Sequence, residues 1–301
     1  MTANVKSGFS LVEMVVAMAI MVTMTGAIFE LMNPAYGLFQ AQPDASDLQQ
    51  RVRVSTDAIF KDLVSAGAGT GGRLPGVMPF RRGTDAPDPP GTFFADRVSV
   101  LSIPAFAPRT TVRIATEGNA VLVNEQPTCP NSDPLCGFGT GELAVIFDES
   151  GAYDTFRITD VGKTPPVLVH AGSTLSKSYA EGAVVASVAA ATYSLQTDQA
   201  TGLRQLMKYD GDRTNLPLVD DVEGLRFEWF GAAGSLGRAL LTDGPWLPDA
   251  ASPARYDADL LRVRRIRVSL RVRPERLFLG APLLDQRISF DVTPRNLGVG
   301  P

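Results

Sequence analysis

The sequence predicts an α+β protein, in which a long N-terminal, membrane-anchoring α-helix packs on a C-terminal β-rich domain of antiparallel sheet. Three observations support this prediction. An uncharged run extends from Met14 to Phe29, and about 20 apolar residues are enough to span a bilayer core. Apolar residues recur at helical spacing over about 44–67. From residue 97 onward, short alternating runs are separated by turn residues, which is typical of strands.

The composition suits one sizeable domain, or two small ones, beyond the anchor. The chain has 301 residues, is 45% hydrophobic and carries a formal net charge of −4. This mild acidity gives no overall attraction to nucleic acid. The predicted organisation is a leader at 1–8, an N-terminal helix at 9–70, a linker or surface loop at 71–96 and a β-rich domain at 97–301. The helix is expected to have a transmembrane half at about 9–30 and an amphipathic half at about 44–67.

Glu13 is the one charged residue in the apolar run from Phe9 to Phe29. An ionised carboxylate at bilayer depth costs roughly 2.5–3.5 kcal/mol on insertion scales, so its presence calls for a functional reason. A cut between Gly8 and Phe9 would create an α-ammonium group four residues before Glu13, on the same helix face. That group can neutralise the carboxylate within one chain or between neighbouring chains.

The orientation of the segment follows from its flanking charges. Lys6 precedes the apolar run, and no basic residue follows it before Arg51. The positive-inside bias therefore keeps Lys6 in the cytoplasm and carries the rest of the chain across the membrane.

The segment Gly8-Phe9-Ser10-Leu11-Val12-Glu13, followed by an apolar helix, resembles the class III signal of type IV prepilins and type II secretion pseudopilins. The resemblance implies that a membrane prepilin peptidase removes the leader after Gly8 and that Phe9 is N-methylated. It implies that Glu13 is the assembly carboxylate, and that the partners are the prepilin peptidase, other minor pilins or pseudopilins, and the inner membrane. A plain signal anchor would explain the apolar run but not Glu13. A secretory signal peptide has a shorter apolar core of about 7–15 residues.

The helix is expected to be interrupted and then to resume. Asn33-Pro34-Ala35-Tyr36-Gly37 should kink or break it, because proline lacks an amide donor and clashes with the preceding turn. From about Asp47 an apolar face returns, formed by Leu48, Val52, Ile59, Leu63 and Ala66. The helix should then end at a group of glycines, Gly67, Gly69, Gly71 and Gly72.

Strands are expected at 98–103, 111–115, 142–147, 155–159, 167–170, 183–195, 203–209, 225–229 and 265–272. In the last strand, Ile266 and Val268 belong to an apolar face that is opposite a face rich in arginine. Val263 is out of phase with that pattern, which predicts a bulge near Arg264.

The C-terminal part resembles PilW-like minor pilins and J-type minor pseudopilins. The similar segments are 218–229, the strand at 265–272, Ile288-Ser289-Phe290 and Pro294-Arg295-Asn296-Leu297. We favour a PilW-like minor pilin that primes or caps a type IV pilus, with a J-type pseudopilin of a type II secretion system as the alternative. The resemblance implies a single-pass inner-membrane protein with a periplasmic C-terminal domain, later placed at the base or tip of a pilus or pseudopilus.

The two cysteines, Cys129 and Cys136, lie in a segment rich in turn residues. A disulfide is the expected state in the periplasm. A metal site is the alternative, but two cysteines and the distant His170 fall short of a complete tetrahedral set. We therefore predict no metal and no other cofactor.

Three further hypotheses concern charged or catalytic groups. Six arginines, which we call the arginine stripe, could bind DNA phosphates or form a solvated strand face: Arg262, Arg264, Arg265, Arg267, Arg271 and Arg273. Asp220, Asp221 and Glu223 could form a turn or a calcium site. No catalytic constellation is present, so we predict that the protein is not an enzyme; a membrane-anchored periplasmic enzyme is the alternative.

Overall fold

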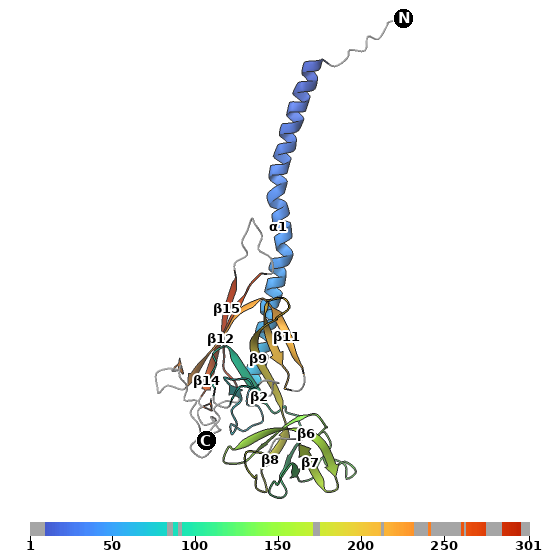
Figure 1. Cartoon of the computed structure of the whole chain (residues 1–301), viewed down its shortest axis with the longest axis vertical. Helices are drawn as coiled ribbons and strands as arrows, with labels where there is room; N and C mark the ends of the chain where they lie inside the picture. The colour runs from blue at the N-terminus through green and yellow to red at the C-terminus, as the bar shows by residue number, and fades with distance from the viewer. Residues whose placement is uncertain are drawn as a thin grey trace. The chain divides into compact units, whose positions relative to one another are not determined.

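The computed structural model describes residues 10–82, 87–89, 92–170, 175–211, 214–231, 240–241, 260–261, 263–274 and 285–295. It confirms the α+β class, because one N-terminal helix is followed by strands whose pairings are all antiparallel (Figure 1). The chain divides into two compact units, Met1–Gln50 with Pro274–Asp285 and Arg51–Arg273 with Gln286–Pro301.

Helix α1 runs from Leu11 to Ser65 without interruption. The predicted break at 33–37 is therefore wrong. A proline removes only one amide donor, and long helices with a membrane-spanning part tolerate this when the remaining backbone bonds are kept. The predicted end is confirmed, since the helix stops at Ser65 and all four glycines that follow it have positive φ.

The part of α1 within the second unit, residues 51–65, packs with one apolar face inward. Val52, Ile59 and Leu63 are buried, as predicted from their spacing. The backbone after the helix is fixed to strand β2 (Arg97–Ser102), since Gly67 donates to the carbonyl of Leu101 and Ile103 donates to that of Ala68.

A five-stranded sheet contains, in spatial order, β1 (Val77–Met78), β2, β9 (Ala189–Thr197), β10 (Arg204–Tyr209) and β11 (Asn215–Asp220). The prediction of a linker or surface loop at 71–96 does not hold over 74–80, because Leu74, Val77, Met78 and Phe80 are buried and β1 pairs with β2. The many prolines and glycines hid this short apolar segment.

A four-stranded sheet contains β13 (Leu240–Leu241), β12 (Val222–Gly231), β14 (Val263–Val272) and β15 (Gln286–Val292). Phe230 pairs with Arg265 and Gly231 pairs with Val263, so Arg264 is the extra residue. This confirms the predicted bulge. Leu225, Phe227 and Trp229 are buried on one face of β12, also as predicted.

Six further strands form a closed barrel. Their order is β3 (Arg109–Thr111), β8 (Val184–Ser187), β5 (Leu143–Phe147), β6 (Tyr153–Lys163), β7 (Pro166–His170) and β4 (Ala120–Leu122). The first and last strands meet, because Val112 bridges to Val123 and the amide of Arg113 donates to the carbonyl of Leu122 at 2.9 Å. Closure removes exposed strand edges, and the enclosed side chains, among them Ile146, Phe156 and Leu168, form a core of their own.

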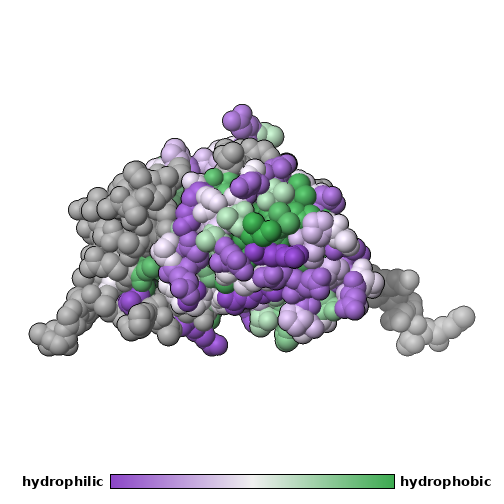
Figure 2. Space-filling view, turned by 90° about the horizontal axis from the view of Figure 1, so that it is seen from below, coloured by the Kyte–Doolittle hydropathy of each residue, from purple (hydrophilic) through white to green (hydrophobic). Residues whose placement is uncertain are grey.

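The barrel is an insertion in the five-stranded sheet. Ser102 at the end of β2 pairs with Ala189 at the start of β9, so the chain leaves the sheet and returns to it at one point. The predicted strand 183–195 is therefore two strands, β8 in the barrel and β9 in the sheet. In the surface seen from below, a compact hydrophobic area lies among hydrophilic residues (Figure 2).

Arg82 joins the barrel to the five-stranded sheet. Its Nη1 donates to the hydroxyl of Tyr153 at 2.7 Å and its Nη2 to Thr155 Oγ1 at 3.2 Å, both on β6. Its backbone amide donates to Ser99 Oγ on β2, and its carbonyl accepts from Thr192 Oγ1 on β9. One arginine therefore contacts three strands.

Candidate functional site

The start of α1 is held by a reciprocal pair of hydrogen bonds. The amide of Ser10 donates to Glu13 Oε2 at 2.8 Å, and the amide of Glu13 donates to Ser10 Oγ at 3.2 Å. This is a capping box, in which two otherwise unsatisfied amides at a helix start are both bonded. The Ser-x-x-Glu spacing before an apolar run was the signal for it, and the sequence analysis missed that signal.

The segment after the cap has the length and composition of a membrane span. The segment Leu11–Met32 has 22 residues and a mean hydropathy of 2.1, and none of it is buried inside the structure. Its large apolar side chains are exposed around the helix, from Leu11 at 80% to Leu31 at 76%. The two threonines return their hydroxyls to the helix, Thr23 to the carbonyl of Ala19 and Thr25 to that of Met21. Glu13 in the first turn and Glu30 near the other end are therefore the charged residues of this segment.

Gly8 and Phe9, the predicted cleavage and methylation residues, lie outside the described residues. Glu13 is described and lies in the first turn of α1. The arrangement of the scissile bond relative to the carboxylate therefore stays a prediction.

In the second unit, Asp62 fixes the end of α1 to the five-stranded sheet. One of its oxygens, Oδ2, accepts from the hydroxyl of Tyr193 at 2.6 Å and from Lys208 Nζ at 2.7 Å. Burial, together with the negative charge of Asp62, raises the pKa of Tyr193, so the phenol keeps its proton. The hydroxyl of Ser65 donates to the carbonyl of Asp62.

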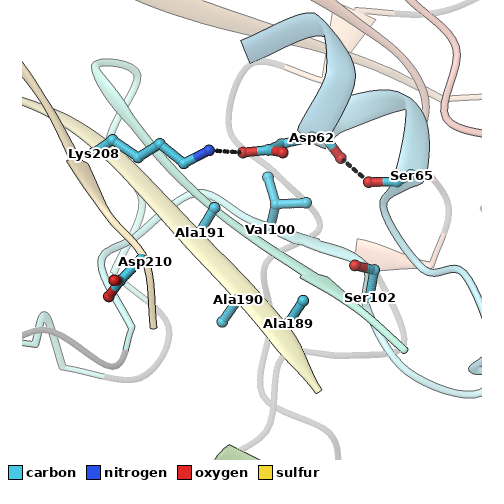
Figure 3. Close-up of a pocket in the computed structure, with 9 residues that line it drawn as sticks. All are labelled: Asp62, Ser65, Val100, Ser102, Ala189, Ala190, Ala191, Lys208 and Asp210. Carbon is cyan, nitrogen blue, oxygen red and sulfur yellow. Dashed lines mark hydrogen bonds and ion pairs between the residues drawn. The ribbon is translucent and has the colours of Figure 1, made fainter. Parts of the chain in front are cut away.

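A cavity of about 190 Å³ lies beside this contact (Figure 3). Its walls are formed by the end of α1, by β2, by the three alanines at 189–191 and by the β10 side, where Lys208 and Asp210 lie. Asp62 and Lys208 neutralise each other, and this ion pair anchors the end of the helix to the sheet.

Asp221 is the second charged contact of the helix. Its carboxylate is 3.3 Å from Arg51 Nη1 and 3.7 Å from Arg273 Nη2, and only 6% of its side chain is exposed. Arg273 also pairs with Glu223 at 3.1 Å, and Asp220 accepts from Gln205 Nε2 at 2.8 Å. The acidic group proposed for calcium is therefore engaged by arginines and an amide.

Several side chains of the arginine stripe form ion pairs with acidic residues. Asp291 on β15 is 3.0 Å from Arg265 Nη1 and 2.8 Å from Arg267 Nε. Arg264 donates to the carbonyl of Leu261, and Arg262 lies outside the described residues. This pairing weakens the attraction that a row of uncompensated cations would exert on DNA phosphates.

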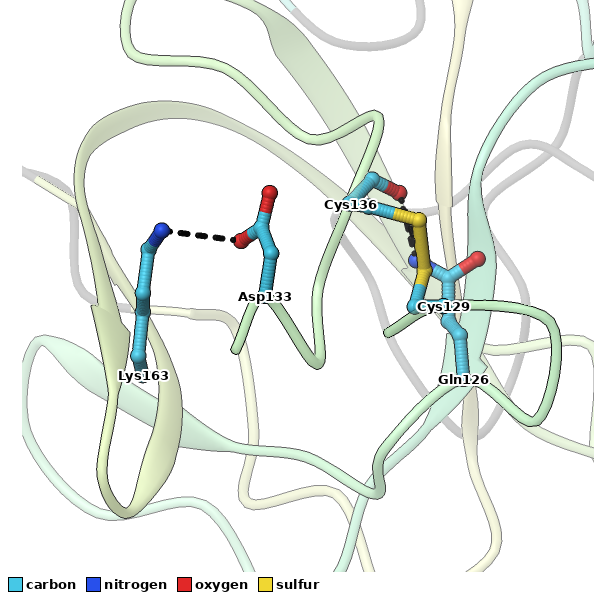
Figure 4. Close-up of a disulfide and its surroundings, with 5 residues drawn as sticks. All are labelled: Gln126, Cys129, Asp133, Cys136 and Lys163. Atoms are coloured by element: carbon cyan, nitrogen blue, oxygen red, sulfur yellow. Dashed lines mark hydrogen bonds and ion pairs between the residues drawn. A yellow bond between two sulfur atoms is a disulfide. The ribbon is translucent and has the colours of Figure 1, made fainter. Parts of the chain in front are cut away.

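Cys129 and Cys136 form a disulfide with a Cα–Cα distance of 5.6 Å (Figure 4). The closed loop is held further by Gln126 Nε2, which donates to the carbonyl of Cys136, and by an ion pair between Lys163 and Asp133 at 3.2 Å. Leu135 within the loop is fully buried in the barrel core. The loop therefore contributes to barrel packing.

His170 is buried on β7 beside Phe156, with ring centroids 5.2 Å apart. Across the part of the chain that the structure describes, no group of three or more His, Cys, Asp or Glu residues is placed to hold a metal ion.

Comparison with known proteins assigns the N-terminal segment. Residues 4–29 match the family model described as the prokaryotic N-terminal methylation motif. No curated protein and no solved structure matches the chain. Together with the exposed apolar helix, the match supports a place in the type IV pilin and pseudopilin family. This family is typically structural, and its motif indicates processing by a prepilin peptidase, methylation, membrane anchoring and assembly with other pilins.

Proposed function

We propose that this protein is a PilW-like minor pilin that assembles with other minor subunits to prime or cap a type IV pilus. In this proposal the prepilin peptidase cuts between Gly8 and Phe9, Phe9 is N-methylated, and residues beyond the membrane span lie in the periplasm. The match of residues 4–29 to the methylation motif carries the proposal. An apolar helix surface whose two carboxylates, Glu13 and Glu30, lie near its ends supports it, because such a surface buries well among similar helices.

The capping box gives Glu13 a partner before cleavage. In the precursor the carboxylate accepts from the Ser10 amide, which offsets part of the cost of placing it near the membrane. After cleavage, the new ammonium group of Phe9 lies one residue before Ser10. We propose that Glu13 then exchanges a neutral amide for a charged partner, on its own chain or on a neighbouring helix, and that this exchange accompanies assembly. A charged hydrogen bond is roughly twice as strong as a neutral one.

The substitution Glu13→Gln tests the negative charge of this residue separately from its role in capping the helix. Glutamine keeps the acceptor of a capping box but loses the negative charge. We expect Glu13→Gln to enter the membrane and to lose its leader normally, yet to be absent from sheared pili. Glu13→Ala should behave in the same way in the pili and should also weaken the helix start.

The matched control is Glu30→Gln, which removes another exposed carboxylate from the same helix. It should be incorporated like the natural protein. Incorporation is measured by immunoblotting sheared pili and the membrane fraction from the same cells. Normal amounts of Glu13→Gln in pili would contradict the proposed role of the charge.

A further inference from the structure

The outer face of the four-stranded sheet has two halves that differ in charge balance. Strands β12, β14 and β15 lie side by side, and their register places each outward residue opposite one on the next strand (Figure 1). In one half, Arg267 lies opposite Glu228 on β12 and opposite Asp291 on β15. Asp291 accepts from Arg265 at 3.0 Å and from Arg267 at 2.8 Å. In this half the chain supplies its own carboxylates for the arginines.

The other half of this face, as far as the structure describes it, has arginines without an acid opposite them. Arg271 on β14 lies directly opposite Arg287 on β15, and both are exposed. Like charges directly opposite each other destabilise a sheet. Two residues along the strands, Arg226 lies opposite Ser269, which lies opposite Ser289. We call these five residues the arginine corner.

Acids at the same end of the sheet are too few to neutralise the arginine corner. Those in the described ranges are Asp220, Asp221, Glu223 and Asp285. Asp221 lies 3.3 Å from Arg51, and Glu223 lies 3.1 Å from Arg273. Asp220 accepts from Gln205 in the five-stranded sheet, and Asp285 directly precedes β15. Even when Asp285 is counted against Arg271, the charges of the two other arginines of the corner remain.

These two arginines flank a pair of hydroxyl groups. Arg287 forms no ion pair with a described residue, and Arg226 approaches Glu228 only at 3.8 Å, with 69% of its side chain exposed. The hydroxyls of Ser269 and Ser289 are 2.8 Å apart. One of them donates to the other, so the second keeps a hydrogen for a ligand. The arginine corner therefore offers cations and a hydroxyl donor to an anion.

We infer that the arginine corner binds a carboxylate side chain from an acidic segment of a partner protein. Asp291 in the other half of the face shows the arrangement, since its one carboxylate bonds two arginines. At the corner the carboxylate comes from a second protein. Guanidinium groups suit this role, because they form charged hydrogen bonds to carboxylates, often in pairs. The site lies on the face of a sheet, whereas small-molecule sites are concave, so a side chain presented by a protein fits it better.

Extended anionic surfaces fit this face less well. A DNA duplex is stiff over lengths far greater than a strand, so its phosphates would also lie over Glu228 and Asp291. A lipid surface would meet the same two carboxylates. A flexible acidic segment can place its charge at the corner and turn away from them. The inference goes beyond the proposed function, because the contact does not require a filament.

The test is the binding of a fluorescent oligoglutamate peptide to the full chain in a nonionic detergent, measured by anisotropy. The chain carries a formal net charge of −4, so binding of this peptide requires a local cationic site. We expect saturable binding that weakens as salt is added, because salt screens exposed charges. The double variant Arg226→Gln with Arg287→Gln should bind about tenfold more weakly.

The matched control removes two exposed arginines from other places, by Arg53→Gln with Arg113→Gln. It should bind the peptide like the natural chain. The melting temperature of the corner variant should not fall, because Arg287→Gln relieves the repulsion from Arg271. A purely structural role of the corner would instead lower that temperature.

Three results would overturn the inference: no binding of the peptide, an equal loss of affinity in the control variant, or tighter binding of DNA or of anionic lipid vesicles than of the peptide. An early melting transition of the corner variant would also contradict it. Binding is measured on the purified chain, without pili. Failure of this inference is thereby distinguished from failure of the proposed function, which is measured by pilus incorporation.

Discussion

At the scale of single residues, Asp221 shows how a buried charge fixes the helix in the second unit. Its carboxylate lies between Arg51 on α1 and Arg273 at the end of β14, and its backbone has φ of 56°. The amide of Arg273 also donates to the carbonyl of Asp221. Both side-chain partners of this carboxylate are guanidinium groups. Removing the carboxylate therefore takes a counter-charge away from both.

We predict that Asp221→Ala lowers the free energy of unfolding by about 3 kcal/mol, the usual cost of removing one partner from a buried ion pair. The exposed pair between Arg53 and Asp57, with 84% and 72% of the side chains exposed, supplies the control. Asp57→Ala should cost less than about 1 kcal/mol. Urea unfolding of the detergent-solubilised protein gives both values, and equal losses for the two variants would contradict this account.

Asp88 predicts how stability depends on pH. Burial raises its pKa, but hydrogen bonds from Arg81 and the charge of Arg97 outweigh burial and hold the pKa of Asp88 below its ordinary value. A carboxyl whose pKa is lower in the folded than in the unfolded protein stabilises the fold above the unfolded pKa, and this stabilisation is lost as pH falls through the folded pKa.

We therefore expect the thermal midpoint to fall as pH is lowered below about 4, the ordinary pKa of an aspartate. Asp88→Asn should have a lower midpoint at pH 7 and a shallower fall in acid, because its side chain does not titrate. Melting curves between neutral and acid pH test this, and identical acid slopes for the two proteins would show that Asp88 does not contribute.

At the scale of elements, the turn after α1 depends on glycine in two different ways. Gly69 has φ of +72°, and a Cβ atom there would lie 2.7 Å from Ile103 Cβ and 2.8 Å from its carbonyl oxygen. Gly71 has φ of +65° with nothing within 4 Å. Both positions disfavour a side chain, but only Gly69 also lacks the space for one.

Gly71→Ala should destabilise the protein by about 1 kcal/mol, the cost of left-handed backbone for a residue with a Cβ atom. Gly69→Ala should cost clearly more, because the turn or β2 must move. The two melting temperatures measured in parallel decide this. A smaller loss for Gly69→Ala than for Gly71→Ala would mean that the close approach to Ile103 is not essential.

The elements that the sequence predicts are those with a local signal. Helical spacing identified the buried face of α1, glycines marked its end, and the phase change at Val263 located the bulge at Arg264. The Ser10–Glu13 cap also had a local signal, the Ser-x-x-Glu spacing.

The elements that sequence reasoning missed depend on contacts between distant residues. β4 has three residues, too few for a recognisable alternation, and the barrel closes where Val112 meets Val123. β11 contains Pro217, which argues against a strand, but β11 lies at a sheet edge where proline is tolerated. The helix α1 likewise continues through 33–37, although this segment contains a proline and a glycine, which locally disfavour a helix.

At the scale of the whole molecule, the two units have different chemistry. The first contains a helix segment whose apolar side chains are exposed, a surface that needs lipid or other helices around it. The second is a β-rich body with its own cores and an inserted barrel. The proposed function joins these facts: the helix enters the filament while the body meets neighbouring subunits outside the membrane.

The central proposal is that removal of the leader creates the positive group that Glu13 needs in the filament. The most direct measurement is the intact mass of this subunit purified from sheared pili, with peptide sequencing of its N-terminus. The account predicts a chain that begins at Phe9 and is heavier by one methyl group. A subunit in assembled pili that still begins at Met1 would contradict it.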